Sequence, residues 1–154
     1  MIKTAIPVLI LALASLASAQ TTIPNGQGQY CGYLLHGPYV APTTSCQAPI
    51  AGGSIALSNF YAGSFSDPIY AGYPPPTFSL YSSTGGLECS GAMSGTYADG
   101  QVTASFSGTC TDGSLFSGTT VQQIATLIHS EGGGRGGTRR VTSYLITSGS
   151  TIVS

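Results

Sequence analysis

One β-hairpin, between Leu87 and Cys110, constrains the fold more than any other stretch of this 154-residue sequence. Asp99-Gly100 at its centre is a strong signal for a two-residue type I′ turn, which needs positive φ at both central positions. Pairing outward from that turn, apolar or glycine residues alternate with small and mostly hydroxylated residues, the period-two pattern of β-strands. The same register ends with Cys89 opposite Cys110, at a Cα separation that a disulfide accepts. The sequence therefore predicts an antiparallel hairpin with one apolar face and a disulfide at its open end.

The N-terminus has the pattern of a secretory signal peptide. Met1 to Lys3 is a short basic start, Ala5 to Leu16 is apolar, and Ala17-Ser18-Ala19 is a small-residue cleavage site. The apolar run is too short for a membrane anchor. We therefore expect residues 1–19 to be removed, the protein to be secreted to the extracellular space, and no membrane contact to remain after cleavage.

The four cysteines of the chain are expected to form two disulfides, because exported proteins fold in an oxidising compartment. The hairpin register favours Cys89–Cys110, which leaves Cys31–Cys46 by elimination. No histidine stands at metal-ligand spacing from either pair, and no Cys-x-x-Cys motif occurs. The sequence therefore indicates structural cysteines and predicts neither a metal nor a cofactor.

After the signal peptide, the pattern predicts a flexible lead-in over residues 20–29 and a single all-β domain over residues 30–154. Outside the hairpin, alternating apolar residues predict strands at 30–35, 54–62, 77–82, 120–129 and 138–148. The connecting stretches, rich in glycine, proline or small polar residues, are predicted as loops at 39–49, 63–76 and 131–137. Short strands at regular spacing, separated by Asp-Gly turns, predict a small antiparallel sandwich or barrel.

Two details of this strand pattern stay open. The segment 120–129 fits a short helix as well as a strand, and its valine and isoleucine content favours the strand. Asp112-Gly113 predicts a second two-residue turn, which places Cys110 opposite Leu115. Farther from that turn the register sets apolar residues against polar ones, so we expect a bulge or a register change.

The low charge of the chain excludes some functions and weakens others. Charged residues make up 6% of the sequence, against about 25% in ordinary soluble domains, and the formal net charge is −1. Such a surface is a poor partner for nucleic acid. Hydrolytic acid–base catalysis needs carboxylates or histidines held at a cleft, and the remaining candidates after the turn residues are Asp67, Glu88 and His129. Ordinary turn and surface roles explain these three side chains, so the sequence does not predict an enzyme.

Aromatic side chains gather around the proline-rich stretch 63–76. Tyrosine combined with glycine, serine and proline on a loop is typical of adaptable contact surfaces, and functional contacts concentrate on loops. The candidate binding residues are Phe60, Tyr61, Tyr70, Tyr73 and Tyr81. The alternative is that the same rings pack the loop onto the sheet, and the sequence leaves both interpretations open.

One part of the chain resembles a known family. Residues 57–61 (Leu-Ser-Asn-Phe-Tyr), Phe78 and residues 85–90 (Gly-Gly-Leu-Glu-Cys-Ser) are similar to the early half of the Alternaria major-allergen family. Members of that family are small secreted fungal β-barrel proteins with structural disulfides. The resemblance implies a non-enzymatic extracellular protein, a homodimer, that meets host proteins or small aromatic ligands, and it carries over no catalytic residue.

Three hypotheses about function follow from the sequence. The first is a secreted binding protein, effector-like or allergen-like, whose contact surface is the loop from Tyr61 to Tyr81. The second is a structural component of a cell wall or surface matrix, as the abundance of serine, threonine and glycine allows. The third is a small secreted hydrolase built on the three candidate side chains named above.

Overall fold

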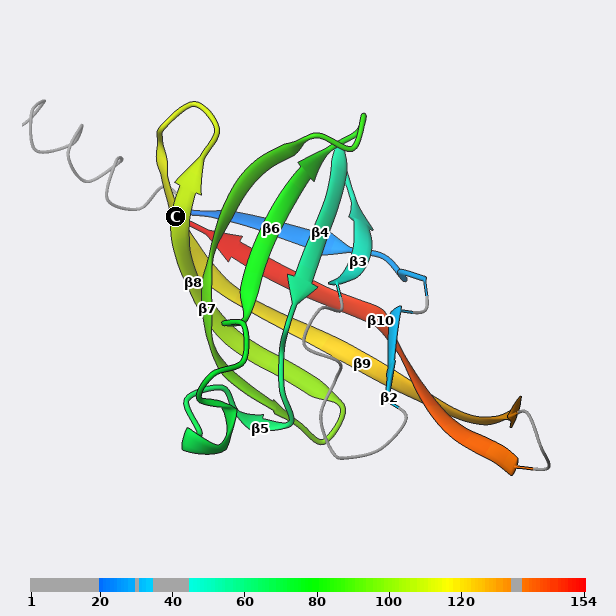
Figure 1. Ribbon diagram of the computed structural model, residues 1–154. Coiled ribbons are helices and arrows are strands. Elements are labelled where there is room, and N and C mark those ends of the chain that lie inside the picture. The colour runs from blue at the N-terminus through cyan, green and yellow to red at the C-terminus, as the bar shows by residue number, and fades with distance from the viewer. Residues whose placement is uncertain (1–19, 30, 35–44, 134–136) are drawn as a thin grey trace, which may run out of the picture.

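The chain folds into a closed antiparallel β-barrel of eight strands (Figure 1). The computed structural model describes residues 20–29, 31–34, 45–133 and 137–154, with the side chains of 32–34, 128–133 and 137–142 left out. The barrel strands, in chain order, are β1 (Thr21–Asn25), β3 (Ser45–Ile50), β4 (Gly53–Ser58), β6 (Thr77–Ser82), β7 (Leu87–Ala98), β8 (Gln101–Cys110), β9 (Leu115–Gly133) and β10 (Gly137–Val153). Neighbours in this order pair with one another, and β10 returns to pair with β1. The predicted signal peptide lies outside the described residues.

Two short strands and one turn of helix lie beside the barrel. Strand β2 (Cys31–Leu34) pairs with β10, and β5 (Gly63–Ser64) pairs with the end of β7. The 3₁₀ helix η2 (Pro68–Tyr70) follows β5. In Figure 1, β5 and η2 lie at the end of the barrel where β4 ends, and the β3–β4 turn lies at the opposite end. Within the described residues, no helix is long and apolar enough to cross a membrane.

The hairpin between Leu87 and Cys110 forms with the predicted register. All ten residue pairs from Ala98–Gln101 to Cys89–Cys110 are those expected from the Asp-Gly turn. Asp99 and Gly100 both have positive φ, 53° and 74°, as a type I′ turn requires. The disulfides Cys89–Cys110 and Cys31–Cys46 both form, with Cα separations of 3.8 and 5.1 Å. The segment 120–129 is part of a strand, β9, as its composition favoured.

An aromatic cluster fills the centre of the barrel where the hairpin carries glycine. Gly91 and Gly108 face each other across β7 and β8, and a Cβ at either would meet the opposite backbone at 2.3 and 2.1 Å. The ring of Phe106 stacks 4.2 Å from Phe78 and lies 4.8 Å from Phe116. Register places Phe78 beside Gly91 and Phe116 beside Gly108, and the two glycines let the backbones of β7 and β8 approach closely at this level.

A buried polar cluster joins the strands at which the barrel closes. Gln122 on β9 is fully buried, and its Nε2 donates to Asn25 Oδ1 and Thr120 Oγ1, both at 2.9 Å. The hydroxyls of Thr120 and Thr151 lie 2.9 Å apart. A Cβ at Gly149 would lie 2.1 Å from Gln122 Oε1, so the absence of a side chain there makes room for the amide. The cluster therefore links β1, β9 and β10 by side-chain hydrogen bonds inside the barrel.

The turn between β8 and β9 differs from the expected one by a single residue. Leu115 pairs with Thr109, not with Cys110. The loop has three residues: Gly113 donates to the Cys110 carbonyl at 2.9 Å and has φ of 87°, and Cys110 donates to the Ser114 carbonyl at 2.8 Å. This is the pattern of a type I turn followed by a left-handed glycine. This three-residue loop shifts the register of β8 against β9 by one residue. A register change was expected because a two-residue turn would have set apolar residues opposite polar ones.

Several stretches predicted as loops belong to strands. Residues 21–25 form β1, where a flexible lead-in was expected, because they pair with the C-terminal end of β10. Residues 45–50, in the predicted loop 39–49, form β3 opposite β4. Pro49 is tolerated because it needs no N–H toward β4. The Pro49 carbonyl accepts from the Gly26 N–H on the other side of β3, and the backbone nitrogen of Pro49 faces that same side. The connection 131–137 is shorter than predicted, since β9 continues to Gly133 and β10 begins at Gly137 and runs on to Val153.

Candidate functional site

Three of the five candidate aromatic residues are part of the core. Phe60, Tyr61 and Tyr70 are 0%, 2% and 7% exposed. Tyr61 and Tyr70 stack with ring centroids 4.3 Å apart, and their hydroxyls donate to the carbonyls of Pro74 and Ala62. These contacts fasten the stretch 63–76 onto the barrel. These three side chains are therefore not available as a contact surface. Their burial agrees with the alternative interpretation, in which the rings pack the loop onto the sheet.

The other two candidate aromatic residues keep exposed surface in different places. Tyr73 is 40% exposed and lies at the loop, 5.9 Å from the ring of Tyr61. Tyr81 lies on β6 and is partly exposed. Register places Tyr81 opposite Ser54 of β4, on the outer face of the barrel and at the end away from the loop. The five candidates are therefore not brought together into one surface.

Burial controls the ionisation of the tyrosines. Desolvation raises the pKa of Tyr61, and the nearby Tyr73 and Tyr70 raise it further. Desolvation, with a smaller contribution from Tyr144, raises the pKa of Tyr97 to about 12. The phenols thus remain neutral and act as packing groups and hydrogen-bond donors.

The carboxylates named as hydrolase candidates do not meet. Asp67 caps η2 by accepting from the Ile69 N–H at 3.0 Å, and this turn lies near Thr96, at the end of β7 that pairs with β5. Glu88 lies at the opposite end of β7, eight residues from Thr96, about 26 Å along a strand. The side chain of His129 lies outside the described residues. Within the described part of the chain, no three His, Cys, Asp or Glu side chains are placed to hold a metal ion.

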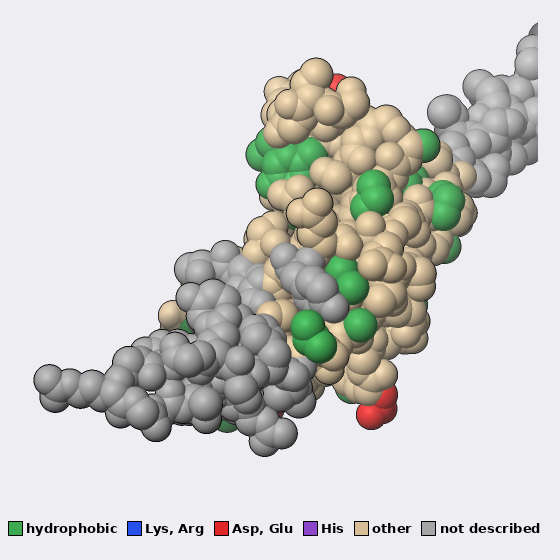
Figure 2. All heavy atoms as spheres, turned by 90° about the vertical axis from the view of Figure 1, so that its right-hand side faces the viewer, with side chains coloured by type: hydrophobic (Ala, Val, Ile, Leu, Met, Phe, Trp, Pro, Cys, Tyr) green, Lys and Arg blue, Asp and Glu red, His purple; other side chains and the backbone are tan. Residues whose placement is uncertain are grey.

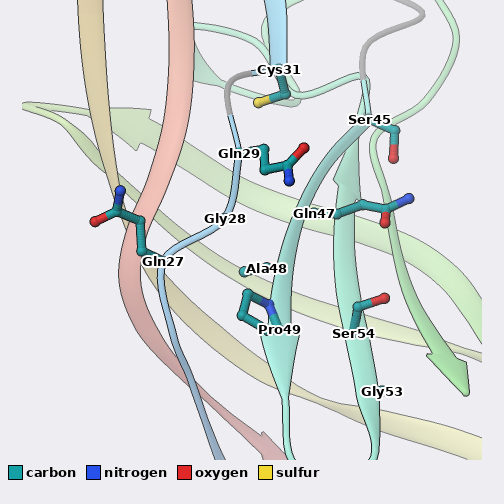
Figure 3. Close-up of a pocket in the computed structure, with 10 residues that line it drawn as sticks. All are labelled: Gln27, Gly28, Gln29, Cys31, Ser45, Gln47, Ala48, Pro49, Gly53 and Ser54. Atoms are coloured by element: carbon teal, nitrogen blue, oxygen red, sulfur yellow. The ribbon is translucent and has the colours of Figure 1, made fainter. Parts of the chain in front are cut away.

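The described surface carries a groove of about 510 Å³, which we call the amide groove. One wall is the segment after β1, and the other consists of β3 and the start of β4 (Figure 3). Its polar side chains are three carboxamides and two hydroxyls, from Gln27, Gln29, Gln47, Ser45 and Ser54. Cys31, Ala48 and Pro49 contribute apolar surface. Among the described residues, no charged side chain lines the groove.

Backbone contacts hold the first wall in place. The N–H of Gly26 donates to the Pro49 carbonyl at 2.9 Å, and that of Gly28 donates to the Ile146 carbonyl at 2.8 Å. A Cβ on Gly28 would lie 1.9 Å from the Gln47 carbonyl oxygen, so only glycine permits this close approach to β3. The Cys31–Cys46 disulfide ties the two walls together at the far end. The groove is thus built on fixed backbone at both ends.

The amides and hydroxyls define what the groove can bind. Figure 3 shows Gln29 pointing from the first wall toward β3, whereas Gln27 points away from β3. Gln47, Ser45 and Ser54 project to one side of β3 and β4. Each carboxamide offers two donors and an acceptor, and each hydroxyl offers both functions. The arrangement suits an uncharged ligand with many hydrogen-bonding groups.

The surface seen in Figure 2 has the same neutral character. Most described atoms on that face belong to the backbone or to side chains that are neither hydrophobic nor charged, and the green hydrophobic atoms form separate small patches. Red acidic atoms occur only near the ends of the described surface in this view.

Sequence reasoning missed the groove because its residues fall in stretches predicted to lack structure. Gln27 and Gln29 lie in the expected lead-in, and Ser45 and Gln47 lie in the expected loop. The alternation of exposed Ser45, buried Cys46, exposed Gln47 and buried Ala48 is a strand signal, although the flanking prolines obscured it.

No family model, no curated protein and no solved structure matches this chain. The molecule is a small disulfide-bonded, eight-stranded antiparallel β-barrel. That much agrees with what the resemblance to the Alternaria major-allergen family implied about the fold.

Proposed function

We propose that the protein is a non-catalytic binding protein whose amide groove takes a neutral, polyhydroxylated ligand, that is, a glycan. The observation that carries this proposal is a groove of about 510 Å³, lined by five amide and hydroxyl side chains and, in the described part of the chain, by no charged one. Its volume lies within the usual range of small-molecule sites, about 300–1,000 Å³.

Hydrogen-bond chemistry favours a glycan over a charged ligand. Neighbouring sugar hydroxyls donate and accept at once, as a carboxamide does, so Gln29 and Gln47 can each satisfy two of them. A charged ligand would lose water in the groove without gaining an opposite charge, which costs free energy. Polar groups on a neutral sugar carry no such penalty when each finds a partner.

Two further features support a binding role outside the cell. Asp67 and Glu88 lie at opposite ends of β7, so the carboxylate pair of a glycoside hydrolase is not assembled from them. The signal-like N-terminus and the two disulfides are typical of exported proteins. Two alternatives to the glycan remain proposals. The resemblance to the Alternaria major-allergen family suggests a homodimer that meets a host protein or a small aromatic ligand, and the abundance of serine, threonine and glycine suggests a structural wall protein.

Titration of the isolated protein with neutral and acidic oligosaccharides tests the proposal. Amide resonances of the groove, followed by NMR, should shift with at least one of cellohexaose, laminarihexaose, maltohexaose or chitohexaose, and not with hexagalacturonate. Replacing Gln29 or Gln47 by alanine removes one or two hydrogen bonds of about 0.5–1.5 kcal/mol each and should weaken binding roughly 2- to 160-fold.

The matched control is Gln123→Ala, which removes an exposed carboxamide on β9, a strand that does not line the groove. It should leave the affinity unchanged. The proposal fails when no neutral oligosaccharide shifts the groove resonances, or when hexagalacturonate binds as tightly as the neutral ligands.

A further inference from the structure

A second hollow of about 450 Å³ continues from the amide groove. We call it the turn hollow, because it lies between the β3–β4 turn and the β6–β7 turn, lined by Ile50, Gly52, Ser82, Ser83 and Gly85. It shares Gly53 and Ser54 with the amide groove. The two hollows therefore meet at the first residues of β4 and follow one another along the surface.

Strand pairing explains why the two turns lie side by side. Gly53 at the start of β4 pairs with Ser82 at the end of β6. Gly52 and Gly85 have φ of 80° and 86°, so each turn depends on glycine and carries little side-chain bulk. The Ser82 hydroxyl accepts from the Gly86 N–H at 3.2 Å, which shapes the second turn. The turn hollow, like the amide groove, is lined by hydroxyl groups and backbone and by no charged side chain among the residues that the structure describes.

An aromatic side chain lies on the strand next to the residues that the two hollows share. Ser54 lines both of them, and its cross-strand partner on the same outer face is Tyr81. Directly opposed Cβ atoms in an antiparallel pair lie about 4.5–5.5 Å apart. Tyr81 is partly exposed and lines neither hollow itself. A tyrosine ring offers a flat apolar face with a polar tip, which suits the C–H face of a sugar ring.

We infer that the amide groove and the turn hollow form one continuous track for a linear, neutral oligosaccharide, with Tyr81 packing against a sugar ring near its middle. This inference rests on the proposed function and specifies its ligand as a chain of several sugar units. A single sugar unit would occupy one hollow, whereas a chain gains hydrogen bonds in the second hollow without a second loss of translational freedom.

An extended peptide fits this track less well than a glycan. Peptides bind sheets by pairing with an unoccupied strand edge. Along the amide groove, the edge of β3 is covered by the preceding segment, with Gly28 against the Gln47 carbonyl and Gly26 bonded to Pro49. The track therefore offers side-chain amides and hydroxyls in place of a backbone ladder.

The test is a chain-length series measured by isothermal titration calorimetry with cello-, laminari-, malto- and chito-oligosaccharides of two to six units. In the series that binds, affinity should rise at least 10-fold from two to five units and then level off. Ser83→Glu places a bulky charge in the turn hollow and should remove this gain while leaving the affinity of the two-unit ligand unchanged. Tyr81→Ala should weaken the five-unit ligand at least 5-fold, and Tyr81→Phe should restore it.

Thr119→Glu is the control, because it places the same charge on an exposed residue of β9 that lines neither hollow. All variants are compared by their NMR spectra, so a folding defect is recognised directly. Binding that depends on Gln29 but not on chain length or on Ser83 overturns the continuous track and leaves the proposed function standing. Failure of every oligosaccharide, the two-unit ligands included, overturns both.

Discussion

At the scale of single residues, steric room decides several positions more strongly than chemistry does. Gly91, Gly108 and Gly149 each face a backbone or side-chain atom at a distance that no Cβ could occupy. The first two let the backbones of β7 and β8 approach closely, and the third accommodates Gln122. A glycine-rich composition, which by itself suggests flexibility, is here a requirement of close packing.

The first stability prediction concerns Gly91→Ala. A methyl group there meets the Ser107 carbonyl oxygen at 2.3 Å, so strand β8 must move away. We expect a loss of about 1–3 kcal/mol in the free energy of unfolding, measured by urea denaturation. Ala92→Ser, a change on the exposed outer face of the same strand, is the control and should cost less than about 0.5 kcal/mol. Equal stability of the two variants would show that the barrel accepts a Cβ at Gly91.

At the scale of elements, turn chemistry sets the register of the strands. Asp99-Gly100 closes a two-residue turn, whereas Asp112-Gly113 belongs to a three-residue loop. In the second loop the Asp112 carboxylate accepts from the backbone N–H and the hydroxyl of Ser114, at 2.9 and 2.6 Å. The same Asp-Gly dipeptide thus yields two registers that differ by one residue, depending on the residue that follows it.

This carboxylate gives a prediction about pH. The Ser114 hydroxyl, followed by the Ser114 N–H, lowers the pKa of Asp112 below its ordinary value. Because the folded pKa is the lower one, the stabilisation is complete above the ordinary pKa of aspartate and is lost as pH falls through the folded pKa. NMR titration of the Asp112 carboxyl carbon should show the lowered pKa, and Ser114→Ala should raise it toward the ordinary value. An unchanged pKa in that variant would refute the assigned cause.

At the scale of the whole molecule, the two disulfides have different tasks. Cys89–Cys110 joins strands that ten residue pairs already hold. Cys31–Cys46 joins β2 to β3, two strands that do not pair with each other, and closes one end of the amide groove. Disulfides that close loops of this length contribute about 3 kcal/mol in chain-entropy models.

The two bridges should therefore differ in their effect on the groove. Replacing Cys31 and Cys46 by serine should increase amide hydrogen exchange in residues 26–31 and 45–50, measured by mass spectrometry. Replacing Cys89 and Cys110 by serine is the control, and its effect should remain near the open end of the hairpin. Unchanged exchange in both groove walls after loss of Cys31–Cys46 would show that backbone contacts alone hold them.

By itself, the sequence determined the elements whose information is local. The hairpin from Leu87 to Cys110 follows from one turn dipeptide and an alternating pattern, because the residues that pair are neighbours along the chain. The same local logic identified β6, with its predicted bounds of Thr77 and Ser82. The disulfide pairing followed from the hairpin register, and the choice between sandwich and barrel stayed open.

Only the tertiary structure decided the parts that depend on distant pairing. Strand β1 forms because Thr21 to Asn25 pair with Gly149 to Val153 near the C-terminus. This pairing closes the barrel around the buried side chain of Gln122. The amide groove exists because that closure brings Gln29 beside β3, and the tyrosines are buried because η2 folds back onto the barrel. Local sequence does not specify such long-range pairings. The partner of a strand depends on the surface that the two strands bury together, and not on the β-propensity of the strand alone.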